Sequence, residues 1–387
     1  MRVGLNALFG ARNDGTGRYT RELLRGAARF SPDAAAWRLV TPDAGPAWSI
    51  SPPVPADLTV RRVPVPSYVH GQNAIKLWFE QRGAPAALDD QVDLIHYPYF
   101  AAPFSSRQPV IVTIHDLIPL VLREYRASAS VRAYMWLQSV TVRRARLILA
   151  DSHASRDDIV ARLRIPEQRV RVVHLGVDEV YRPRSREEIA VAREHLGLPE
   201  RFILYAGGLD VRKNVERLIL AYARVRAANR IVEPLAITGD PDRRGALYRP
   251  LRPLVERLGL RDHVRFLGIV PEELMPALIG AATLYVYPSR YEGFGLPVLE
   301  AMASGVPVAC SNAGSLPEVS GDAAIVFSPD DEDALAAALA RGLGDDPLRH
   351  DLIERGLRQS AQFSWERTAE MTLAAYRGAL SLDAEAA

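Results

Sequence analysis

The sequence has one cysteine and no long apolar run. Cys310 alone excludes an internal disulfide framework and a cysteine-based zinc site. No stretch approaches the roughly 18 uninterrupted apolar residues that a membrane-spanning helix needs. The start of the chain, residues 1–6, lacks the apolar run that would follow a basic start in a signal peptide. We therefore expect a cytoplasmic protein that is soluble or bound peripherally to the cytoplasmic membrane face.

Lysine is almost absent, and the positive charge is uneven. The only lysines are Lys76 and Lys213. Residues 1–176 contain 23 Arg and Lys against 15 Asp and Glu, whereas the remainder contains 25 against 31. No aromatic-basic motif of a nucleic-acid-binding module accompanies this excess, so we expect no nucleic acid partner. The positive charge of residues 1–176 is better explained by binding to anionic phosphates or to an anionic lipid surface. The alternative is an arginine-rich surface that is only solvated.

The length of 387 residues fits two domains. Short apolar segments typical of buried strands alternate with helical patterns in both halves of the chain, which predicts α/β domains with parallel sheets. We predict an N-terminal Rossmann-like domain over 1–176 and a C-terminal one over 177–364, facing a central cleft. A final helix over 365–387 should pack back toward the first domain. Ligands should bind at the carboxyl ends of the strands.

The most informative motif runs from Glu292 to Glu300, between an expected strand and a helix. Glycines allow the backbone to approach a ligand closely, and free amides at a helix N-terminus can bind a phosphate. The amides in question belong to Phe294, Gly295 and Leu296. The two carboxylates can accept hydrogen bonds from sugar or ribose hydroxyls. The alternative is a turn glutamate and a solvated helix glutamate.

A second motif places two cations after a glycine-rich turn. Gly208 lies four residues before Arg212 and five before Lys213. Lysine binds phosphate as a point charge and arginine as a fork, so this turn is a candidate diphosphate site. A solvated turn is the alternative, although the scarcity of lysine favours a role for Lys213.

Two weaker signals lie in the first half of the chain. Gly15 and Gly17 follow the first strand and can admit donor phosphates or the acceptor, unless they only form a tight turn. His115 and Asp116 end an apolar strand and should point into the cleft. A histidine there can hydrogen-bond a reacting sugar or stabilise developing charge, the alternative being a structural strand-end histidine.

Together these motifs resemble the retaining glycosyltransferases of family 4, which have the GT-B fold. Glu292 and Glu300 match the E-x7-E pair of that family, and the segments 301–308 and 314–318 match its continuation. The His115 to Pro119 run resembles the branch of mannosyltransferases in polysaccharide and O-antigen assembly. The resemblance covers essentially the whole chain.

The resemblance implies a role for each matched residue. Lys213 would bind the donor diphosphate, Glu300 the ribose hydroxyls, and Glu292 the transferred sugar. Gly239 and Val270 would frame the nucleotide base. Many members have an arginine where this chain has Gly208, and Arg212 is a candidate replacement for that charge.

The implied reaction transfers a hexose, with retention, onto a glycan or lipid-linked acceptor. We expect the hexose to be mannose and its donor to be GDP-mannose. Lys213 and helix amides would stabilise the leaving diphosphate, so we expect no metal and no cofactor. His115 and Glu292 would support the reacting sugar, and Asp116 would support the acceptor. Two alternatives remain open, a nucleotide-sugar 2-epimerase and a non-catalytic nucleotide-sugar-binding protein.

Two stretches of the first half combine cations with large apolar side chains. Such composition can hold a protein at an anionic membrane surface, with about 1 kcal/mol for each cation close to it. The alternative is that the apolar residues face the domain core. The stretches comprise Ile75, Lys76, Leu77, Trp78, Phe79 and Arg82, and then Arg132, Tyr134, Met135, Trp136, Arg143, Arg144 and Arg146.

Overall fold

The computed structural model describes residues 1–11, 14–45, 48–126 and 128–384, the side chains of the last few residues excepted. The chain divides into two compact units. One consists of Met1–Gly176 together with Ser364–Ala387, and the other of Val177–Phe363. Each is built around its own parallel sheet, which confirms the prediction of two Rossmann-like domains.

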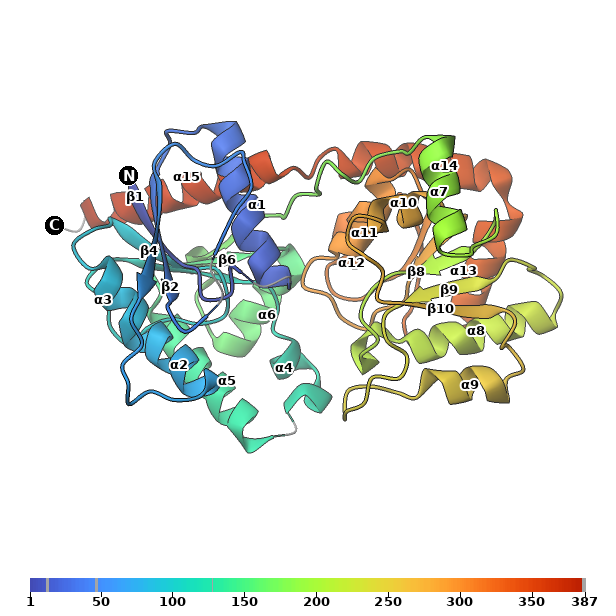
Figure 1. Ribbon diagram of the computed structural model, residues 1–387, viewed down its shortest axis with the longest axis horizontal. Coiled ribbons are helices and arrows are strands. Elements are labelled where there is room, and N and C mark those ends of the chain that lie inside the picture. The colour runs from blue at the N-terminus through green and yellow to red at the C-terminus, as the bar shows by residue number, and fades with distance from the viewer. Residues whose placement is uncertain (12–13, 46–47, 127, 385–387) are drawn as a thin grey trace. The chain divides into compact units, whose positions relative to one another are not determined.

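The first unit contains a seven-stranded sheet in the order β3-β2-β1-β4-β5-β6-β7 (Figure 1). All of its neighbouring strands pair in parallel. Its strands are β1 (Arg2–Asn6), β2 (Ala36–Pro42), β3 (Leu58–Val63), β4 (Leu94–Tyr97), β5 (Val110–Ile114), β6 (Leu147–Ala150) and β7 (Val170–Val172).

The two longest helices of this unit pack against each other, α1 (Gly15–Phe30) and the C-terminal α15 (Trp365–Ala384). In Figure 1, α15 (red) lies beside α1 (blue). Their contact is close, because a Cβ at Gly26 would lie 2.1 Å from the carbonyl oxygen of Trp365. The others are α2 (Gln72–Trp78), the π-helical turn η1 (Phe79–Gly83), α3 (Ala84–Leu88), α4 (Ile118–Val121), η2 (Arg123–Arg126), α5 (Ala129–Thr141), η3 (Val142–Arg144), α6 (His153–Leu163) and η4 (Glu167–Arg169).

The second unit contains a six-stranded parallel sheet in the order β10-β9-β8-β11-β12-β13. Its strands are β8 (Ile203–Tyr205), β9 (Leu235–Thr238), β10 (Val264–Gly268), β11 (Leu284–Tyr287), β12 (Val308–Ser311) and β13 (Ala324–Phe327). Its helices are α7 (Arg186–His195), η5 (Val211–Lys213), α8 (Val215–Ala227), α9 (Leu251–Arg257), α10 (Met275–Gly280), α11 (Leu296–Ala303), α12 (Leu316–Ser320), α13 (Glu332–Gly344) and α14 (Asp346–Ser360).

The strand β3 is not one of the short apolar segments from which the sequence predicts buried strands. It lies at the edge of its sheet and pairs only with β2. Four of its six residues are exposed, and two of those are Arg61 and Arg62. An edge strand that buries so little apolar surface lacks the hydrophobic pattern by which central strands are found.

Candidate active site

The loop between β11 and α11 brings Glu292 to the carboxyl end of the sheet. The loop needs glycine at its last position, because Gly295 has φ +111° and a Cβ there would lie 2.7 Å from Cδ2 of Leu316. Helix α11 then begins at Leu296, with Pro297 in its first turn, where a missing N–H costs nothing. Phe294 and Glu292 are almost fully buried in this loop.

The segment after β12 supports this loop from behind. The Ser315 hydroxyl donates to the carbonyl oxygens of Glu292 at 3.1 Å and Phe294 at 2.5 Å. Gly314, at φ +58°, passes so close that a Cβ would lie 2.4 Å from the Glu292 carbonyl oxygen. The matched segment 314–318 therefore holds the backbone that carries Glu292.

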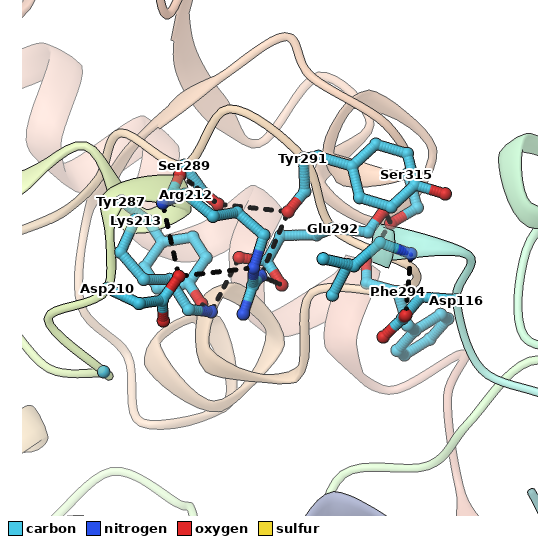
Figure 2. Close-up of polar contacts among 12 residues, drawn as sticks. Asp116, Asp210, Arg212, Lys213, Tyr287, Ser289, Tyr291, Glu292, Phe294 and Ser315 are labelled. Atoms are coloured by element: carbon cyan, nitrogen blue, oxygen red, sulfur yellow. Dashed lines mark hydrogen bonds and ion pairs between the residues drawn. The ribbon is translucent and has the colours of Figure 1, made fainter. Parts of the chain in front are cut away.

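Glu292 forms ion pairs with both cations of the second motif (Figure 2). Its Oε1 lies 2.7 Å from Nζ of Lys213, and its Oε2 lies 2.7 Å from Nη1 of Arg212. Burial alone would raise the pKa of the Glu292 carboxyl, but the charges of Lys213 and Arg212 lower it to about 2. The site thus holds an ionised carboxylate between two cations.

Lys213 is only 8% exposed, and its ammonium has two hydrogen-bond partners. Besides the carboxylate, its ammonium donates to the hydroxyl of Tyr287 at the end of β11. Burial lowers the pKa of the Lys213 ammonium, and the Glu292 charge offsets only part of this effect. A lysine fixed in this way presents its charge in a defined position.

Arg212 joins the two motifs through its backbone as well as its side chain. Its carbonyl oxygen accepts from the amide of Arg290 at 2.8 Å, and its Nη1 donates to the carbonyl of Tyr291 at 3.0 Å. The carboxylate of Asp210 accepts from the Arg212 amide at 3.2 Å and caps the short η5 helix. The turn after β8 and the loop after β11 are thus joined by hydrogen bonds into one cluster.

The remaining donor-side candidates lie in this unit too. Glu300 lies within α11 and is 6% exposed. Gly208 accepts a hydrogen bond at its carbonyl from the Tyr205 hydroxyl, at 2.5 Å. Gly239, at φ +99°, directly follows β9 and forms a bridge with Gly268, the last residue of β10; the buried Val270 lies two residues after Gly268.

In the first unit, both ring nitrogens of His115 face acceptors. Nδ1 lies 2.8 Å from Oδ2 of Asp151, and Nε2 lies 3.1 Å from the carbonyl oxygen of Pro98. Burial would lower the pKa of His115, but the Asp151 carboxylate outweighs it and raises the pKa above its ordinary value. With an acceptor at each nitrogen, the protonated ring can donate both of its N–H groups, and the raised pKa favours that form.

The other two candidate positions of this unit make local turns. The Asp14 side chain accepts from the Gly17 amide at 2.9 Å and caps α1, which begins at Gly15. Asp116 accepts from the Ile118 amide at 3.0 Å. The Asp14 carboxylate thus satisfies the hydrogen bond of one of the first amides of α1.

The sequence matches two family profiles that together cover most of the chain. Residues 13–180 match that of glycosyltransferase family 4, and residues 188–359 match that of glycosyl transferases group 1. Over 305 residues the chain is 38% identical to O-antigen chain mannosyltransferase B of Escherichia coli, with 79% of each chain covered. The chain belongs to glycosyltransferase family 4.

A second relative and a solved structure extend the comparison. The chain is 34% identical over 269 residues to the serotype-specific mannosyltransferase WbdA of Escherichia coli. This match covers 68% of this chain but only 32% of WbdA. The solved structure of sucrose-phosphate synthase from Thermosynechococcus elongatus superposes with a TM-score of 0.75 at 24% identity, covering 99% of this chain and 100% of that one. The fold is GT-B, and the family 4 enzyme is a hexosyltransferase.

Sequence reasoning missed three residues of this glycosyltransferase that contact the candidate groups. Tyr287 accepts from Lys213, Asp151 pairs with His115, and Ser315 holds the Glu292 loop. Tyr287 and Asp151 lie at or just after the ends of strands β11 and β6, where ligands of parallel sheets bind. That position is the signal by which both could have been found.

Proposed function

We propose that this glycosyltransferase transfers mannose from GDP-mannose, with retention, to a glycan or lipid-linked acceptor in cell-surface polysaccharide synthesis. The choice of mannose rests on the similarity to the O-antigen chain mannosyltransferase B and to WbdA. The main structural support for a donor site is the cluster of Arg212, Lys213 and Glu292, in which two cations pair with one buried carboxylate.

The cluster suits the departure of a nucleoside diphosphate. Lys213 and Arg212 would meet the charge that develops on the leaving diphosphate, together with the amides of Gly295 and Leu296 at the start of α11. Glu292 keeps both cations in place before the donor binds, and its carboxylate would then accept from hydroxyls of the transferred sugar. Arg212 would supply the charge that is missing at Gly208.

Retention would follow from attack of the acceptor on the face that the diphosphate leaves. His115 would support the reacting sugar in its protonated form, which the acceptors at both of its nitrogens favour. For the same reason we assign it no role as a general base. Glu300 would bind the ribose, and Gly239 and Val270 would border the base.

We propose that the reaction needs no metal and no other cofactor, since protein cations offset the charge of the leaving group. The test measures transfer from radiolabelled GDP-mannose after dialysis against excess EDTA. Activity should survive unchanged. Complete loss that one divalent ion restores would overturn this proposal.

We further propose weak peripheral binding to an anionic membrane. Among the described residues, no helix is long and apolar enough to cross a bilayer. Trp136 is 67% exposed on α5, and the exposed Arg132 lies one turn before it, on the same face. Tyr134 on this helix instead donates to Glu80, and Lys76 lies 3.9 Å from the Glu80 carboxylate, so these two serve the domain interior.

Sedimentation with vesicles tests the membrane proposal. Binding to anionic vesicles at low salt should exceed binding to neutral ones, and Trp136→Ala should reduce it. Val191→Ala is the matched control, because Val191 is 63% exposed but lies in the other unit. Equal sedimentation with anionic and neutral lipid would mean that the enzyme does not use this surface.

A further inference from the structure

A chain of hydrogen bonds runs through the interior of the first unit. The hydroxyl of Tyr376, on α15, lies 2.7 Å from Nδ1 of His96 on β4. Nε2 of His96 lies 2.8 Å from Oγ1 of Thr113 on β5, and that oxygen lies 3.1 Å from the hydroxyl of Tyr19 on α1. All four side chains are at most 2% exposed. The chain therefore joins four elements without access to water.

The buried histidine makes this chain sensitive to the loss of either partner. Burial lowers the pKa of His96 to about 3, so its ring is neutral and has one N–H and one lone pair. Both nitrogens have a partner only when Tyr376 and Thr113 are both in place. A buried nitrogen without a partner is unfavourable, and the ring or its strand would shift to avoid it.

The same two strands continue directly to the groups that hold His115. Thr113 lies two residues before His115. His96 lies two residues before Pro98, and the carbonyl oxygen of Pro98 is the partner of His115 Nε2. Tyr19 adds a direct contact, since its ring packs edge-on against the His115 ring with centroids 4.8 Å apart. The chain thus includes a residue two positions before His115 and one two positions before its acceptor Pro98, and it contacts the His115 ring through Tyr19.

We propose that Tyr376 is a positioning residue of this glycosyltransferase, which orients His115 through His96 and Thr113. The C-terminal helix is then part of the site's support as well as of the domain core. Two further bonds anchor α15, from the Thr368 hydroxyl to the carbonyl of His174 at 2.7 Å and from Arg29 to Glu366 at 3.1 Å. The functional consequence rests on the proposed role of His115.

The first experiment compares Tyr376→Phe with the matched control Tyr222→Phe. Tyr222 is equally buried, and its hydroxyl is likewise hydrogen-bonded, to the carbonyl oxygen of Glu233, but it lies in the other unit. NMR of histidine-labelled full-length protein gives the pKa of His115, whose signal His115→Asn identifies. We expect a lower pKa in Tyr376→Phe, because a loosened ring gains less from Asp151, and about a tenfold lower kcat with unchanged donor Kd. The control should change neither.

Thr113 provides a second, independent variant pair. Thr113→Val keeps the shape but removes the bridging hydroxyl, so it should reproduce the effects of Tyr376→Phe, and Thr113→Ser should restore wild-type values. An unchanged His115 pKa in both Tyr376→Phe and Thr113→Val would overturn the proposal. A lowered pKa with unchanged kcat would support the positioning link and instead refute the proposed catalytic role of His115.

Discussion

The sharpest consequence of the structure concerns Lys213→Met, which removes the ammonium but keeps most of the apolar stem. The variant should fold, because the carboxylate of Glu292 retains Arg212 at 2.7 Å as a counter-ion. The ammonium that is lost belongs to a residue only 8% exposed and is hydrogen-bonded to two partners, so its charge acts through little water. Loss of one such preorganised group costs about 3 kcal/mol of transition-state stabilisation, or roughly a hundredfold in kcat.

The assay is steady-state transfer from GDP-mannose, with thermal unfolding measured in parallel. The control is Arg224→Met, which removes a 55% exposed cation that pairs with Asp333 on the surface of the same unit. The control should retain wild-type kcat. A well-folded Lys213→Met enzyme with near wild-type turnover would refute the assignment of Lys213 to the leaving diphosphate.

Three further predictions concern the other charged groups. Glu300→Ala should chiefly weaken binding of GDP in calorimetry, whereas Glu292→Ala should lower turnover more than GDP affinity; equal effects would refute this division. His115→Ala should lower turnover as Glu292→Ala does, and unchanged turnover would leave His115 a structural residue. The variant should also have a lower melting temperature, because it leaves the carboxylate of Asp151, a residue only 2% exposed, without its histidine partner. Because the folded pKa of Glu292, about 2, lies below the ordinary value of 4.5, the carboxyl contributes stability above that value and loses it as the pH falls. Urea unfolding between about pH 5 and pH 2 should therefore show a smaller loss of stability in Glu292→Gln than in the wild type, and equal losses would contradict the ion-paired state.

The sequence was sufficient to predict the two parallel sheets and the loops at their carboxyl ends. Buried strands such as β5 and β11 are short apolar runs, and the glycine, proline and glutamate spacing from Glu292 to Glu300 identifies the loop and helix that follow β11. These features are local in the chain, so a sequence pattern is enough to reveal them.

The side-chain partners could not be predicted in the same way. Lys213 and Glu292 are 79 residues apart, and His115 and Asp151 are 36 apart, so only the paired strands bring them together. The sequence therefore suggested phosphate binding by Lys213 without its contact to Glu292. It likewise suggested a polar role for His115 without the acceptors that hold both of its nitrogens.

The most direct test of the proposed reaction is the anomeric configuration of its product. The enzyme would be incubated with GDP-mannose, an α-linked donor, and mannose oligosaccharide acceptors, and the one-bond C1–H1 coupling of the new linkage would be measured by NMR. The proposed retaining transfer predicts an α-linked mannose. A β-linked product would contradict it.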